Sequence, residues 1–328
     1  MIKVFKMSSI LNFIDHNKLR LTNYLLLPFS VVFFILSQLR VWFYKVGILK
    51  VSQAEVPVIV VGNITVGGSG KTPIVIALCR YFESQSKSVG VVSRGYGGKY
   101  TQDTLKVTPL TDPKECGDEP ALIAQQTNAQ VVVAKRRSKA IKYLTSNGQV
   151  DIIISDDGLQ HYAMGRDLEI VVIDGIRRFG NGLLLPSGPL REPLKRLKSV
   201  DIVINNGSIV EGEICSQLNP EHYVNLLTNE IKQLDYFKGT QCYAVAGIGN
   251  PTNFYTLLES QGVNLISKSF PDHHSFVAND LAFKEDYPIL MTAKDCVKCK
   301  HFATSQMWYL SVSAELNTDF YKQLESKL

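Results

Sequence analysis

A glycine-rich turn between an apolar strand and a helix holds the residues best suited to chemistry. It follows the apolar run 58–61 and reads Thr-Val-Gly-Gly-Ser-Gly-Lys-Thr. Glycines let backbone N–H groups close around phosphate oxygens, and the N-terminus of the next helix favours the same negative charge. Lys71 would reach the β- and γ-phosphates of ATP, and the Thr72 hydroxyl would ligate Mg²⁺. The predicted nucleotide contacts form one continuous stretch: Thr65, Val66, Gly67, Gly68, Ser69, Gly70, Lys71 and Thr72.

This loop departs from the usual pattern G-x-x-x-x-G-K-[ST] at one position. Thr65 stands where the first glycine belongs, and Gly67, Gly68 and Gly70 supply the flexibility instead. The alternative interpretation is a glycine-rich turn without a ligand. The strand before the loop and the apolar helix after it favour the phosphate-binding interpretation.

Two adjacent carboxylates follow a second apolar strand. Asp156 and Asp157 come directly after the run 151–155. Neighbouring carboxylates repel each other unless a cation lies between them. In phosphate-loop proteins an acidic residue at this place holds Mg²⁺, directly or through water. A solvated Asp-Asp-Gly turn is the alternative.

Asp118 and a pair of histidines are candidates for proton transfer. Asp118 precedes a predicted helix, where it could be the N-cap or the base that accepts a proton from a substrate hydroxyl. The spacing leaves both interpretations open. His273 and His274 follow Asp272, and an aspartate can orient a neighbouring histidine for proton transfer. A simple polar turn is the alternative for the histidine pair.

Arginines follow several of the predicted strands and turns. Arg94 lies in a glycine-rich turn, Arg191 follows a Pro-Ser-Gly-Pro turn, and Arg137 ends a run of three basic residues. The planar guanidinium donates two parallel hydrogen bonds to phosphate. One such arginine alone is typical of a surface charge, but several at one edge of a sheet indicate a site for a second phosphate.

The elements that must position these residues alternate between strand and helix. Continuous apolar strands between helices predict a mostly parallel sheet covered on both faces, with ligands at the carboxyl ends of the strands. The predicted strands are 58–61, 89–93, 131–134, 151–155, 169–173 and 201–205, and the predicted helices are 72–84, 120–127 and 137–146. The candidate motifs fall at the carboxyl ends of these strands.

A second α/β pattern begins near residue 241. Its predicted strands are 242–246, 264–269, 288–291 and 307–312, and its predicted helices are 252–261 and 315–326. A boundary between residues 218 and 239 is plausible on this pattern. We therefore predict an α/β fold in three parts, listed in chain order: a membrane-associated helical segment in 1–50, a P-loop core in 51–225 and a smaller C-terminal α/β domain in 226–328.

The amino-terminal segment is apolar enough to interact with a membrane. Residues 21–39 contain no charged side chain, and a bilayer span needs about 20 apolar residues. Pro28 and several polar residues interrupt the run, and basic residues on both sides give no orientation. A helix embedded in one leaflet is therefore favoured over a span or a buried core helix. The lack of a small-residue cleavage site argues against a signal peptide.

The composition excludes several classes of protein. The chain has 328 residues, 45% of them hydrophobic and 20% charged, so it can bury a large core. A net charge of +5 gives no indication of nucleic-acid binding, but it suits an anionic membrane surface or phosphorylated substrates. The six cysteines are scattered, which is typical of free thiols in a reducing cytoplasm. Cys296 and Cys299 lack a second pair that would complete a zinc site.

Taken together, six motifs closely resemble the tetraacyldisaccharide 4'-kinase family, the lipid A 4'-kinases of Gram-negative bacteria. In chain order they are residues 65–73, 93–97, 117–120, 156–161, 190–193 and 272–274. The resemblance implies ATP-dependent phosphorylation of the 4'-hydroxyl of a tetraacyldisaccharide 1-phosphate to give lipid IVA, with Mg²⁺ as the second cofactor. It also implies a P-loop kinase core and a place at the cytoplasmic face of the bacterial inner membrane. The expected partners are the lipid-linked disaccharide and that membrane, with no nucleic acid and no obligate protein partner.

The resemblance also implies roles for individual residues. Asp118 corresponds to the catalytic base and His273 to the histidine paired with it, although His274 remains an alternative. The expected groups around Mg²⁺ and ATP are Thr72, Asp156, Asp157 and Glu192, and the expected phosphate contacts are Lys71 and Arg191. The expected substrate contacts are Arg94, Tyr96, Arg137 and His274.

The chain departs from the family at its beginning. Residues 1–18 form a longer extension than the family needs, so Met7 is an alternative start to Met1. The apolar run is also more hydrophobic than an interfacial helix requires, which leaves its depth in the membrane open. Two rival interpretations remain: a phosphate-loop regulatory protein without kinase activity, and a small-molecule kinase whose apolar segment is part of the core.

Overall fold

The predicted strands of the first α/β pattern lie side by side in one sheet. The computed structural model describes residues 19–147 and 149–328, so the extension 1–18 and the alternative start Met7 lie outside the described residues. The strands of this half are β1 (Val58–Gly62), β2 (Val89–Ser93), β3 (Leu105–Val107), β4 (Gln130–Val133), β5 (Ile152–Asp156), β6 (Leu168–Asp174) and β7 (Ile202–Asn206). They are ordered β7-β6-β1-β5-β2-β4-β3, and all neighbours are parallel except β3 and β4. The mostly parallel sheet predicted from the sequence is confirmed.

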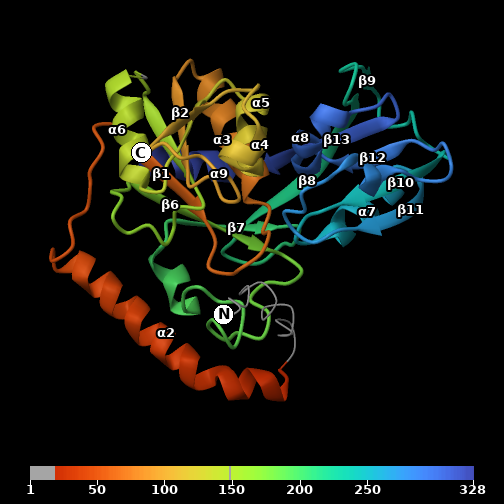
Figure 1. Ribbon diagram of the computed structural model, residues 1–328. Coiled ribbons are helices and arrows are strands. Elements are labelled where there is room, and N and C mark those ends of the chain that lie inside the picture. Colours follow the sequence, from red (N-terminus) through yellow and green to blue (C-terminus); the bar gives the residue numbers. More distant parts are fainter. Residues whose placement is uncertain (1–18, 148) are drawn as a thin grey trace, which may run out of the picture.

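Helices cover both faces of this half of the sheet (Figure 1). On one face the apolar sides of α3 (Lys71–Ser84), α5 (Asp118–Gln126) and α9 (Thr318–Lys327) share a core with alternate strand residues such as Ile59 and Ile154. On the other face α6 (Arg137–Asn147) packs on the opposite residues of the same strands. Strands buried on both faces explain why their sequences are continuously apolar.

The sheet continues into a second lobe. Its strands are β8 (Ile214–Asn225), β9 (Ile231–Lys232), β10 (Gln241–Ala246), β11 (Asn264–Ser269), β12 (Ile289–Thr292) and β13 (Met307–Leu316). Its helices are α7 (Pro251–Ser260) and α8 (Ala293–Cys299). In the first lobe, the single turn α4 (Pro113–Cys116) precedes α5. The short 3₁₀ helices are η1 (Leu194–Ser199), η2 (Ala278–Leu281) and η3 (Lys300–Phe302). Across the described residues the order continues from β7 as β8-β13-β12-β10-β11, with β9 on β8.

The long strand β8 joins the two lobes and was not predicted from the sequence. It is parallel to β7 and antiparallel to β13. Its sequence contains Pro220, which cannot donate to a ladder, and the pairing with β13 shifts at this point so that Glu221 is left over. The predicted domain boundary at 225/226 falls at the end of β8 and stays a prediction. After β13 the chain returns to the first lobe, where Phe320 of α9 is fully buried.

The apolar amino-terminal segment forms α2 (Leu21–Lys45), which runs along the outside of the molecule (Figure 1). Its most apolar window has a mean hydropathy of 1.8, and only 6% of that window is buried. By length and composition it is the one described helix that could cross a membrane. The interpretation of this segment as a buried core helix is therefore wrong.

Candidate active site

The glycine-rich loop connects β1 to the start of α3, as the sequence predicts. Gly67 and Gly70 have positive φ angles of 90° and 78°, which are strained for other residues. Gly70 is also the N-cap of α3, and a side chain there would clash with the amide of Asn206. Glycine is therefore required at position 70 for both its conformation and its space.

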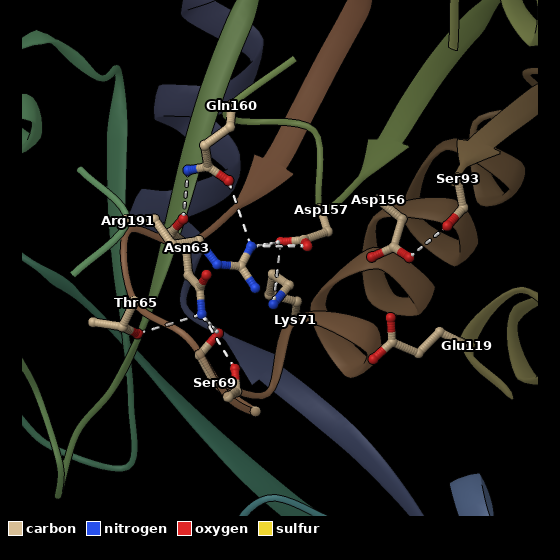
Figure 2. Close-up of polar contacts among 12 residues, drawn as sticks. Asn63, Thr65, Ser69, Lys71, Ser93, Glu119, Asp156, Asp157, Gln160 and Arg191 are labelled. Carbon is tan, nitrogen blue, oxygen red and sulfur yellow. Dashed lines mark hydrogen bonds and ion pairs between the residues drawn. The ribbon is translucent and has the colours of Figure 1, made fainter. Parts of the chain in front are cut away.

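Three side chains support this loop: Asn63 directly before it (Figure 2), and Arg177 and Asn206 from distant segments. The Asn63 amide donates to Ser69 Oγ at 3.1 Å, and the Asn206 amide donates to the Ser69 carbonyl at 3.3 Å. The Arg177 guanidinium donates to the Gly68 carbonyl. These contacts occupy side-chain and carbonyl groups of the loop. The Val66 amide donates to the Pro189 carbonyl, so the amides of Gly67, Gly68, Ser69 and Gly70 are the ones placed to bind an anion.

Lys71, Asp157 and Arg191 form a charged group at the mouth of the loop (Figure 2). Asp157 lies 3.4 Å from Lys71 Nζ and 3.0 Å from Arg191. Burial opposes ionisation of Asp157, but the two cations outweigh it and hold its pKa far below the usual value. Two cations that share one carboxylate form a site suited to the oxygens of a triphosphate.

Asp156 lies deeper than Asp157 at the end of β5. It is fully buried; its Oδ2 accepts a 3.2 Å hydrogen bond from Ser93, and its Oδ1 has no partner. Burial, together with the charges of Glu119 and Asp157, raises the pKa of Asp156 to about 7. Glu119 points toward the same space (Figure 2) and pairs with Lys294 at 3.0 Å. A buried carboxylate with a free oxygen and acidic neighbours fits a nearby cation.

This arrangement fits Mg²⁺ only together with a nucleotide. Among residues 19–147 and 149–328, no three His, Cys, Asp or Glu side chains are grouped so that they could hold a metal ion alone. Mg²⁺ usually keeps several waters and binds one or two carboxylates with the phosphates of a substrate. The buried Thr72 in the first turn of α3 and the unpartnered Asp156 Oδ1 are donors of the appropriate kind.

Asp118 pairs with His273 across the two lobes. Its Oδ2 lies 3.2 Å from His273 Nδ1 and 3.7 Å from Lys298 Nζ. Burial opposes ionisation of Asp118, but the hydrogen bond from His273 and the nearby lysines hold its pKa below the usual value. The N-cap interpretation of Asp118 is wrong, because Gly117 is the N-cap of α5 and no side chain caps that end.

The two neighbouring histidines have different partners. His274 Nε2 lies 2.9 Å from Asp280, and its ring stacks on Phe270 at 4.6 Å. His273 is therefore the histidine of the pair that lies beside Asp118. The exposed ring of Tyr96 is 5.1 Å from the His273 ring, so this predicted substrate residue lies at the same place. Arg94, two residues earlier, is also exposed.

Arg137 and Glu192 are buried, and their side chains bind groups of the protein itself. Arg137 is 5% exposed and donates to the main-chain carbonyls of Asp156 and Asp157, each at 2.8 Å. Glu192 is 7% exposed and accepts from Gln160 at 2.8 Å and Tyr162 at 2.6 Å. Both side chains thus support the loops behind the site, and their predicted contacts with substrate and Mg²⁺ stay predictions.

The structure adds residues that the sequence reasoning missed. Glu119 follows Asp118 directly, so its acidic type next to a candidate base was an available signal. Lys294 and Lys298 lie one turn apart on α8 and reach Glu119 and Asp118, respectively. Their four-residue spacing predicts that both side chains lie on one face of the helix, but the neighbouring sequence does not indicate which residues that face contacts. Arg177 and Asn206 likewise reach the phosphate loop from distant segments.

Comparisons with known proteins show the family of this chain. The sequence model of the family described as tetraacyldisaccharide-1-P 4'-kinase matches residues 22–328. A tetraacyldisaccharide 4'-kinase of Ruthia magnifica is 56% identical over 93% of this chain and 97% of that protein. One from Haemophilus influenzae is 49% identical over 89% of each chain. A crystal structure of Aquifex aeolicus LpxK in complex with ATP superposes with a TM-score of 0.78, at 30% identity, over 93% of this chain and 98% of that chain. This chain therefore belongs to the tetraacyldisaccharide-1-P 4'-kinase family.

Proposed function

We propose that this protein transfers the γ-phosphate of ATP to the 4'-hydroxyl of a tetraacyldisaccharide 1-phosphate, which gives lipid IVA. The curated relatives carry the name of that kinase, and the Aquifex aeolicus protein is described in complex with ATP. The observation that carries the proposal is the pair of Asp118 and His273. The next residue, Glu119, points toward Lys71 of the phosphate loop and toward Asp156 (Figure 2). A base and a triphosphate site then meet at one edge of the sheet.

The nucleotide occupies the loop 65–72 in this proposal. Its amide groups and Lys71 bind the phosphates, and Arg191 contributes a second cation. Lys71 pairs with Asp157 at 3.4 Å, so a triphosphate in the loop would share or take over that cation. Thr72 and the Asp156–Asp157 pair would hold Mg²⁺ with the phosphates. The ion would neutralise charge that develops on the transferring phosphoryl group.

Asp118 accepts the proton of the sugar hydroxyl. A carboxylate only accepts hydrogen bonds, so the Nδ1 atom of His273 carries the proton that points at Asp118. This hydrogen bond orients the carboxylate, and the positive charge of Lys298 keeps it ionised. An ionised, oriented carboxylate beside the phosphate loop is the group that an alcohol acceptor requires.

The apolar helix α2 places the enzyme on the cytoplasmic face of the inner membrane. Large apolar side chains such as Leu25 and Phe29 are 69% and 63% exposed along it. Ser30, in the first half of the helix, bonds to Leu184 and Ser187 of the first lobe. A span would draw that lobe into the hydrocarbon, so the helix lies in one leaflet. The acyl chains stay there while the sugar reaches Asp118, past the exposed Arg94 and Tyr96.

The test is phosphorylation of the proposed acceptor by wild-type protein and Asp118→Asn. Protein in detergent is incubated with ATP and tetraacyldisaccharide 1-phosphate, and mass spectrometry follows the addition of one phosphate. We expect Asp118→Asn to lower kcat by about 10²–10⁴-fold with ATP affinity largely kept, because general-base catalysis contributes that much.

The matched control is Asp112→Asn, an exposed aspartate whose side chain caps the turn before α5. Asparagine caps equally well, so this variant should retain wild-type turnover. Absence of a phosphorylated product with wild-type protein would refute the proposed reaction. Normal turnover by Asp118→Asn would refute only the role of the base.

A further inference from the structure

The helix α2 has its polar and apolar sides reversed relative to a helix of a soluble protein. Its two buried residues are both polar: Asn23 is 0% exposed and Ser30 is 5% exposed. They are seven residues apart, which is two turns, so they lie on the same face. Most of the large apolar side chains of this helix are exposed, as Leu25 and Phe29 are. The polar face therefore meets protein, and the apolar face is left for lipid.

Both buried side chains bind the same short segment, which follows β6. The Asn23 amide donates to the Ser187 carbonyl at 2.6 Å. The Ser30 hydroxyl donates to the Leu184 carbonyl at 2.9 Å and accepts from the Ser187 amide at 3.1 Å. The Ser187 hydroxyl, also fully buried, lies 2.8 Å from that of Ser30. The contacts are buried or partly buried, where a polar group that loses its partner is costly.

The other end of this segment pairs with the phosphate loop. The Val66 amide donates to the Pro189 carbonyl at 2.8 Å, and the Arg191 amide donates to the Ile64 carbonyl at 2.7 Å. Between these bonds, Leu190 forms an antiparallel bridge with Thr65. The first residues of the nucleotide loop and the phosphate-binding Arg191 are thus in one small ladder with the segment.

The segment is also closed on itself, so its two ends move together. The Leu185 amide donates to the Leu190 carbonyl at 2.9 Å, and the Gly188 amide donates to the Leu184 carbonyl at 3.0 Å. It therefore joins α2 on one side to the phosphate loop on the other. We call residues 184–191 the linking segment.

Apolar packing alone does not seat α2 on the linking segment. An open groove of about 470 Å³ separates them, lined mainly by apolar side chains that include Leu27, Phe34 and Leu190. The hydrogen bonds of Asn23 and Ser30 are the polar contacts that join the two elements beside this groove.

We propose that Asn23 and Ser30 are positioning residues that hold the phosphate loop and Arg191 in place through the linking segment. The helix that meets the lipid surface is thereby part of the support of the nucleotide site. Its polar face sets the geometry for ATP, and its apolar face sets membrane affinity. The inference rests on the proposed function in one respect, namely that the loop 65–72 binds ATP.

The experiment compares full-length wild-type protein with the double variant Asn23→Ala/Ser30→Ala. The matched control is Ser37→Ala, a half-buried serine of α2 two turns after Ser30, whose hydroxyl donates to the Phe34 carbonyl of its own helix. Three quantities are measured at a temperature below unfolding: sedimentation with vesicles of inner-membrane lipids, hydrogen exchange of peptides covering 60–67 and 184–192, and ATP affinity.

We expect the double variant to sediment with vesicles as the wild type does, because its apolar face is unchanged. Exchange should accelerate at the Val66 and Arg191 amides, and ATP affinity should fall by about tenfold, the effect of losing roughly one buried hydrogen bond. Ser37→Ala should behave as wild type in all three measurements. Ser30→Thr alone retains a hydroxyl and should keep ATP affinity nearer to wild type than Ser30→Ala does.

Unchanged exchange in both peptides of the double variant would overturn the inference, as would an equal effect of Ser37→Ala. Loss of vesicle binding by the double variant would overturn the separation of the two faces. Hydrogen exchange is measured without nucleotide, so it tests the inference even if the protein does not bind ATP. If the proposed function alone is wrong, exchange accelerates in the double variant as expected, but the wild-type protein does not bind ATP. If the double variant does not fold, the single variants Asn23→Ala and Ser30→Ala are measured in the same way.

Discussion

Replacement of Arg137 by methionine is expected to destabilise the fold and to disturb the Asp156–Asp157 turn. The buried guanidinium donates to the main-chain carbonyls of both aspartates at 2.8 Å. Asp157 has a positive φ angle of 49°, a conformation that needs support from its surroundings. Methionine fills a similar volume but leaves both carbonyls without their donor.

The size of the effect follows from these two bonds. A hydrogen bond from a charged donor contributes about 1.5–3 kcal/mol, so their loss costs about 3–6 kcal/mol. Burial works against the charge of Arg137 and lowers its pKa, so removal of the cation returns part of this cost. We expect the free energy of unfolding to fall by about 3 kcal/mol, because breaking a buried charged contact is usually strongly destabilising.

Urea unfolding in detergent, followed by circular dichroism, measures this change. Arg136→Met is the matched control, since Arg136 is adjacent in sequence but exposed. Arg137→Lys should rescue little, because one ammonium group cannot reproduce the fork that bonds two carbonyls. Kinetic assays on the folded fraction should show weakened use of ATP as well as of the acceptor, because the turn carries Asp157.

One result would refute this reasoning. If Arg137→Met unfolds at the same urea concentration as wild type and raises only the KM for the lipid acceptor, the guanidinium contacts substrate. The role of Arg137 as a buried support would then be wrong, and the substrate contact predicted from the sequence would be supported.

Three further predictions concern the loop, a histidine and the base. Gly70→Ala should weaken ATP binding in a fluorescence titration, and adding Asn206→Ala should recover only part of it, because the positive φ remains; full recovery would exclude backbone strain. Burial and nearby arginines lower the pKa of His161 from 6.5 to about 4, so the folded protein binds a proton there less readily than the unfolded chain does. The free energy of unfolding is therefore unaffected by this group above pH 6.5 and falls as the pH is lowered toward 4. His161→Asn should therefore reduce the loss of unfolding free energy that urea unfolding measures between pH 6.5 and pH 4; equal pH slopes for wild type and variant would contradict it. Lys298→Met should raise the pKa of Asp118 and move the acid limb of the kcat/KM profile to higher pH, whereas an unmoved limb would exclude this ion pair from the control of the base.

Much of the first half of the fold could be predicted from the sequence because its signals are local. The strand, the glycine-rich turn and the helix from 58 to 84 are adjacent in the chain, and Gly67 and Gly70 adopt the positive φ angles that their type favours. Buried parallel strands carry continuous apolar runs, which made the strand ending at Asp156 recognisable. The apolar surface of α2 was likewise readable from composition alone.

The strand β8 was missed for a physical reason. Pro220 and several polar residues weaken the local strand signal, and the strand exists because β7 and β13 supply partners on both sides. Lys298 was also missed, because the spacing on a helix face does not reveal the residue that the face contacts.

The sequence by itself determined the phosphate loop, the alternating strands and helices and the apolar amino-terminal helix. Only the tertiary structure decided that His273, and not His274, reaches Asp118 across 155 positions, and that Asn23 reaches Ser187 across 164. It also decided that Arg137 is buried. The physical reason is that conformation and periodicity are encoded by neighbours in the chain. Pairing and burial depend instead on the order in which distant strands join the sheet.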